Sequence, residues 1–106
     1  CSQGLVLDVI VDLRRGSPSY GLHAEFELSA DKGNMLYLPK GIAHGFRVLS
    51  EVATMVYKVS TVYVPGSDSG ILWDSIDYDW GVKYPVISKR DASFERLKDF
   101  ESPFKT

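Results

Sequence analysis

The sequence predicts an all-β domain, either an antiparallel sandwich or a barrel, and three observations support this prediction. Apolar and polar residues alternate with a period of two along most of the chain. The alternating segments are short, follow one another at a spacing of about 8–12 residues, and are separated by glycine and proline. The length of 106 residues corresponds to one domain. We therefore expect several short antiparallel strands around a single core.

The first expected strand covers residues 5–13. Its odd-numbered positions are all apolar, whereas its even-numbered positions also carry Asp8 and Asp12, so one face is fully apolar and the other is mixed. We expect this acidic pair to make supporting hydrogen bonds rather than to perform acid–base chemistry. Further strands are expected at 24–28, 35–38, 45–49 and 53–60.

A short helix is expected near the end of the chain. Phe94, Leu97 and Phe100 recur at helical spacing. Ser88 precedes Asp91 by three residues, which is an acidic variant of the capping box that begins many helices.

Composition and charge exclude several classes of protein. A formal charge of -2 and a pI of about 5.6 do not provide the positive surface that non-specific nucleic-acid binding requires. No apolar run approaches the roughly 20 residues that span a bilayer. The single cysteine, Cys1, cannot form an internal disulfide and is typical of a reducing cytoplasm. Because the sequence opens on Cys1, without an initiator methionine or a signal peptide, we expect it to be the remainder of a longer protein.

The most specific local pattern is Gly33, five residues, Pro39, one residue, Gly41, two residues and His44. It resembles the second conserved motif of the cupins, which are small jelly-roll barrels, although Val48 stands where the family usually has asparagine. The resemblance implies that His44 emerges after a tight turn at the mouth of the barrel. The alternative is an ordinary loop histidine.

Metal binding is not expected. Many cupins bind a metal through this histidine together with two more histidines and a glutamate. This chain has only one other histidine, His23, and the segment around it lacks the family's His-x-His core. Three or four converging ligands are needed for zinc or iron.

A longer resemblance covers nearly the whole chain. The segments GLVLDVIVDLRRGSPSYG, ELSADKGNMLYLPKGIAHGFRVLS, MVYKVSTVYVPGSDSGILWD and ISKRD occur in this order. Together they resemble the dTDP-4-dehydrorhamnose 3,5-epimerase family. This resemblance implies a cupin jelly-roll barrel, here without its N-terminal strands, that acts on a dTDP-4-keto-6-deoxy-hexose in deoxysugar and polysaccharide biosynthesis. It further implies a homodimer without metal or organic cofactor.

The resemblance also implies roles for individual residues. Tyr57 matches the proton donor, and Asp91 matches the carboxylate that orients the catalytic histidine. Four residues match substrate contacts, with the tyrosine among them stacking on the nucleotide base: His44, Tyr63, Asp68 and Arg90. The alternatives are that the two tyrosines are ordinary sheet residues, that Asp68 and Arg90 are solvated loop charges, and that Asp91 only caps the helix.

One departure from the family pattern bears on activity. The family's general base is a histidine in an Arg-Gly-Leu-His segment, and a lysine in a following Gly-Lys-Leu-Val-Arg segment holds the enolate oxygen. Neither segment is found here, and the Gly-Leu-His that ends at His23 matches another part of the pattern. We therefore expect residues 1–106 to be a single epimerase domain that lacks its N-terminal part and does not epimerise alone. Two alternatives are a non-catalytic cupin binding module and a related ketoisomerase or single-centre epimerase.

Overall fold

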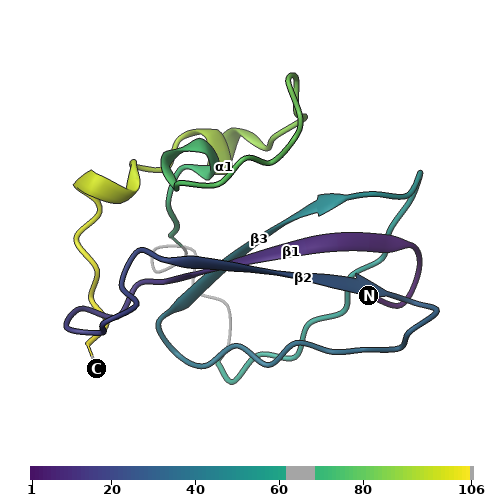
Figure 1. The fold of residues 1–106 in the computed structure, drawn as a ribbon, viewed down its shortest axis with the longest axis horizontal. Helices are drawn as coiled ribbons and strands as arrows, with labels where there is room; N and C mark the ends of the chain where they lie inside the picture. Colours follow the sequence, from purple (N-terminus) through teal and green to yellow (C-terminus); the bar gives the residue numbers. More distant parts are fainter. Residues whose placement is uncertain (62–68, 106) are drawn as a thin grey trace.

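A three-stranded antiparallel sheet forms the centre of the molecule in the computed structural model, which describes residues 1–61 and 69–105. The strands are β1 (Leu5–Asp12), β2 (His23–Ser29) and β3 (Ile42–Val48), in the order β2-β1-β3 (Figure 1). The helical elements are short: two 3-10 turns, η2 (Trp73–Ser75) and η3 (Leu97–Asp99), and one turn of α-helix, α1 (Lys89–Ala92). None of the described helices could cross a membrane.

The register of the sheet assigns each side chain to one of two faces. Ile10 of β1 lies opposite Ala24 of β2 and His44 of β3, so these residues share what we call the first face. The second face carries Val9, which lies opposite Glu25 and Gly45. Figure 1 shows the green and yellow segment with α1 on one side of the sheet and the loops that follow β2 and β3 on the other.

The core is concentrated on β1. Its buried apolar residues are Val6, Val9 and Val11, and they are joined by Leu13 and by Leu28 of β2. Side chains on both faces of β1 are buried, including the polar Asp8 and Asp12, because the segment with α1 lies on one side of the sheet and the loops that follow β2 and β3 lie on the other.

Asp12 organises the turn that follows β1. Its carboxylate accepts hydrogen bonds from the backbone N–H and side chain of Arg14 and from the hydroxyls of Ser17 and Ser19. The hydrogen bonds from Arg14, with help from those of the two serines, hold the pKa of the Asp12 carboxyl well below its usual range. The expectation of a supporting role is confirmed for this residue.

Two of the expected strands are wrong. Residues 35–38 and 53–60 are not strands, apart from an isolated bridge between Thr54 and Gln3. Met35 and Tyr37 are 92% and 86% exposed. The physical reason is that a strand needs a neighbour, and within the described residues neither the apolar run at 35–38 nor the segment at 53–60 pairs with the outer edge of β2 or β3.

The limits of two other elements differ from expectation. The strand expected at 45–49 begins earlier, at Ile42, because its pairing with β1 continues to Asp12. The short helix is present, and Ser88 caps it by accepting a hydrogen bond from the N–H of Asp91 at 3.1 Å. It does not continue through Phe94, because Glu95 pairs with Ile71 as an isolated bridge.

Candidate functional site

Four of the six candidate residues line one pocket. This pocket has a volume of about 1160 Å³ and extends around β3: His44, with Tyr57 beside it, lines it on the first face of the sheet, and the segment that contains Trp80 lines it on the second. The four candidates that line it are His44, Tyr57, Arg90 and Asp91. The remaining two, Tyr63 and Asp68, lie outside the described residues.

His44 is held by a buried carboxylate. Its Nδ1 lies 3.3 Å from Oδ2 of Asp8, whose side chain is 3% exposed, whereas that of His44 is 29% exposed. The sheet register produces this contact: Asp8 lies opposite Phe46 and Ile10 lies opposite His44, so Asp8 and His44 are diagonal neighbours on the first face. Because an ionised carboxylate only accepts hydrogen bonds, the contact favours the tautomer with its proton on Nδ1 and makes Nε2 the acceptor of the ring.

The ring of Tyr57 packs edge-on against His44. The two ring centroids are 5.7 Å apart and the ring planes are inclined at 64°. Tyr57 is 53% exposed, and its partial burial, with the negative charge of Asp8 as a second cause, raises the pKa of the phenol above its ordinary value. A phenol with a raised pKa keeps its proton at neutral pH, which is the state that a proton donor requires.

Asp91 and Arg90 lie side by side at the start of α1. The Nε and Nη2 of Arg90 donate to Oδ1 of Asp91 at 3.1 and 2.9 Å, and the guanidinium lies 5.5 Å from the ring centroid of Phe94. Ser88 caps α1 by accepting from the N–H of Asp91, whereas a capping role of the Asp91 carboxylate stays a prediction. The orienting role of the Asp91 carboxylate stays a prediction.

Asp8 is the member of this site whose contact the sequence reasoning did not identify. Its Oδ1 is buried and has no hydrogen-bond partner within the described ranges 1–61 and 69–105. The available signal was an acidic residue in the middle of the most apolar strand, since a buried carboxylate needs a specific reason to be there.

The residues present do not fit a metal site. His23 lies opposite Val11 and His44 lies opposite Ile10, so the two histidines are on opposite faces of the sheet. Within the described part of the chain, no group of three or more His, Cys, Asp or Glu side chains could hold a metal ion.

Comparison with known proteins gives one consistent family. The family model described as dTDP-4-dehydrorhamnose 3,5-epimerase matches residues 1–99. The enzyme of that name from Shigella flexneri is 41% identical over 101 residues, which are 93% of this chain and 56% of the relative. The one from Escherichia coli is 48% identical over 82 residues, which are 76% of this chain and 44% of the relative. The chain thus spans about half the length of the curated relatives that it matches.

Solved structures agree with the sequence comparison. The 3,5-epimerase from Legionella pneumophila, solved in complex with dTDP-4-keto-L-rhamnose, superimposes with a TM-score of 0.87 at 36% identity. The match covers 94% of this chain and 55% of that one. The enzyme from Bacillus anthracis, solved with TDP and PPi bound, has a TM-score of 0.77 at 39% identity, with coverages of 88% and 54%.

These likenesses confirm the expected fold class, an all-β cupin-type fold with short helical turns. They extend along the chain far beyond the local His44 motif. The chain belongs to the dTDP-4-dehydrorhamnose 3,5-epimerase family.

Proposed function

We propose that this chain contributes the proton-donating side of an epimerase that acts on a dTDP-4-keto-6-deoxy-hexose. The observation that supports the proposal is the contact series Asp8–His44–Tyr57, which sets a tyrosine with a raised pKa beside a carboxylate-held histidine in a large pocket. The relatives named in the comparisons act on this class of sugar nucleotide.

The chemistry needs an acid and a base on opposite faces of the sugar. The C4 ketone acidifies the hydrogens on C3 and C5, so a base can remove one of them and leave an enolate. Return of a proton to the same carbon from the other face inverts the centre. In our proposal Tyr57 gives this proton and the tyrosinate takes another from solvent, while the base is the histidine expected in the segment upstream of Cys1.

The other candidates surround this reaction. His44 would contact the sugar through its Nε2, since Asp8 takes up Nδ1. Arg90 places a positive charge at the pocket wall, where it would meet the diphosphate or a sugar oxygen. Tyr63 remains a proposed stacking partner of the nucleotide base, and Asp68 remains a proposed substrate contact.

The remaining expectations are also proposals. Residues 1–106 would form one cupin-like domain whose barrel is completed by N-terminal strands. The whole protein would be a cytoplasmic homodimer in polysaccharide biosynthesis. One relative, from Streptomyces niveus, is named as a 3-epimerase, so inversion at C3 alone is the second candidate activity.

The decisive experiment is Tyr57→Phe in the protein that carries these residues. Phenylalanine keeps the ring against His44 but has no proton to give, so inverted product should fall by about 10²–10⁴-fold. Affinity for dTDP should hardly change, and the substrate should still exchange C3 or C5 hydrogen for solvent deuterium. Tyr37→Phe is the matched control, because Tyr37 is 86% exposed and lies outside the pocket. Wild-type turnover in Tyr57→Phe would remove the proposed donor, and the carbon that exchanges distinguishes the double from the single epimerase.

A further inference from the structure

A second cluster of aromatic and charged side chains lies on the second face of the sheet, opposite to Asp8 and His44. Its centre is Tyr78, whose hydroxyl donates a hydrogen bond to the Glu25 carboxylate of β2. The rings of Tyr78 and His23 also make a T-shaped contact, with centroids 5.0 Å apart and an interplanar angle of 70°. His23 and Glu25 are two residues apart on one strand and therefore point to the same side. Tyr78 thus contacts β2 at two residues, Glu25 and His23.

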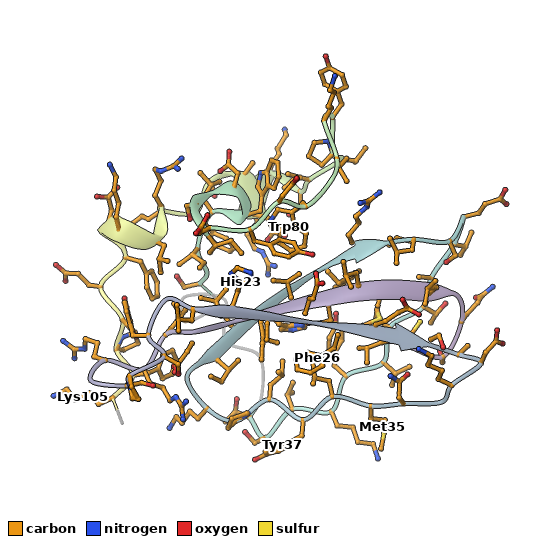
Figure 2. All side chains as sticks on the ribbon, viewed as in Figure 1. His23, Phe26, Met35, Tyr37, Trp80 and Lys105 are labelled. Atoms are coloured by element: carbon orange, nitrogen blue, oxygen red, sulfur yellow. The ribbon has the colours of Figure 1, made fainter. Side chains whose placement is uncertain are left out.

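The cluster continues from Tyr78 to Trp80. Their ring centroids are 5.2 Å apart and the planes are nearly perpendicular, at 87°. Figure 2 shows His23 and Trp80 on the same side of the sheet, the side on which α1 lies. The ring of Trp80 sits over Gly45 of β3, where an added Cβ would lie 3.5 Å from the indole. The Trp80 indole therefore packs in van der Waals contact with β3 at position 45.

Trp80 is also tied to the wall of the candidate site. Its Nε1 donates to the carbonyl oxygen of Trp73 at 2.9 Å, and its own carbonyl oxygen accepts from Nη1 of Arg47 at 2.8 Å. Trp73, Trp80, Arg47 and Gly45 all line the pocket, whereas Tyr78 does not. Tyr78 therefore lies outside the pocket, between the pocket wall formed by residues 73–80 and the edge strand β2.

Side chains, rather than a backbone ladder, hold this wall in place. Between residues 69 and 88 the described regular structure is limited to the 3-10 turn η2 and an isolated bridge at Ile71. A segment with so few backbone hydrogen bonds opens locally unless side chains fix it. The hydrogen bond from Tyr78 to Glu25 raises the pKa of Tyr78 to about 12, so the phenol keeps its proton, and hence the bond, at neutral pH.

We propose that Tyr78 is a positioning residue for the sugar-nucleotide pocket: by joining Glu25 and His23 to Trp80, it fixes the Trp73–Trp80 wall against β3. The identity of the ligand in this inference rests on the proposed function. The role of Tyr78 in fixing the wall does not, because it can be tested without a ligand.

The test is Tyr78→Phe in the full chain, which removes the hydroxyl and keeps the ring. Hydrogen exchange of the backbone amides between residues 71 and 81 should become about 3- to 10-fold faster, while exchange in β1 should be unchanged. The dissociation constant for dTDP should rise by a similar factor. Glu25→Gln keeps an acceptor for the phenol and should resemble wild type, whereas Glu25→Ala should resemble Tyr78→Phe. Tyr37→Phe, on the other side of the sheet, is the control for loss of a tyrosine hydroxyl (Figure 2).

Two results would overturn the proposal. Unchanged exchange at 71–81 in both Tyr78→Phe and Tyr78→Ala would show that Tyr78 does not fix the wall. If Tyr78→Phe accelerated amide hydrogen exchange equally in β1 and at residues 71–81 and left the affinity for dTDP unchanged, Tyr78 would only contribute to the overall stability of the fold. Failure of the wild-type protein to bind dTDP would instead contradict the proposed function, and the exchange result would still decide the role of Tyr78 at the wall.

Discussion

Replacing Asp12 by alanine removes the acceptor on which the turn after β1 depends. Asp12 is 6% exposed and accepts from the backbone N–H of Arg14 at 2.9 Å and from the hydroxyls of Ser17 and Ser19 at 2.6 and 2.5 Å. Loss of each of these three hydrogen bonds costs about 1 kcal/mol, so we expect the free energy of unfolding to fall by about 3 kcal/mol. The ion pair with the Arg14 side chain adds little to this loss, because that side chain is 35% exposed and solvent screens its charge.

The pH dependence gives a second and independent check. The pKa of Asp12 is lowered by folding, so its stabilising effect is complete above the pKa of the unfolded chain, about 4, and is lost as the pH falls below it. Wild type should therefore lose stability below about pH 4 through this group, whereas Asp12→Ala cannot. The free energy of unfolding of wild type should therefore exceed that of Asp12→Ala by about 1 kcal/mol less at pH 3 than at pH 5.

Urea unfolding followed by circular dichroism measures both effects. Wild type, Asp12→Ala and the exposed control Asp31→Ala should be compared at each pH, with equal denaturant slopes as the condition for the comparison. A difference of less than about 1 kcal/mol at pH 7, or a difference that stays constant down to pH 3, would refute the reasoning.

Three further predictions concern the site and the fold. Asp8→Asn should lower the pKa of Tyr57 but leave it above its ordinary value, because partial burial raises this pKa more than the charge of Asp8 does. A difference titration against Tyr57→Phe measures the pKa, and an unchanged value would contradict the role given to Asp8. Gly41→Ala should cost at least about 1–2 kcal/mol in urea unfolding, because φ is +93° and the added Cβ would also collide with Cγ of Arg14; wild-type stability would contradict this. Protein purified without a histidine tag should contain no stoichiometric transition metal, since its two histidines lie on opposite faces of the sheet, and one equivalent of zinc or iron that survives dialysis would contradict this.

The sequence predicted the parts of the fold that have strong local signals. The alternation from Leu5 onward identified β1 and its two faces, and Ser88 identified the start of α1. The segment at 35–38 is wholly apolar and was expected to be a strand, yet Tyr37 is exposed, because a strand requires a neighbour as well as a favourable sequence. Local periodicity does not say which segments find one.

The candidate site, like the fold, has parts that the sequence predicted and parts that it did not. The motif around His44 and the longer resemblance selected residues that line a single pocket. The partner of His44 was not predicted, because Asp8 lies 36 residues away and meets it only through the register of β1 and β3. The cluster at Tyr78 depends on the same long-range register, since β2 and β3 must both pair with β1.

The pairing of β3 with β1 has a consequence for which insertions and deletions this sequence can tolerate. His44 faces Asp8 on one side of the sheet, and its neighbour Gly45 seats Trp80 on the other. A slip of β3 by a single residue would send every side chain of that strand to the opposite face. It would remove the histidine from its carboxylate and push a side chain under the indole in the same event. Changes of length in the connecting segments 13–22 and 30–41 are therefore compatible with this site only where they leave the register between β3 and β1 unchanged.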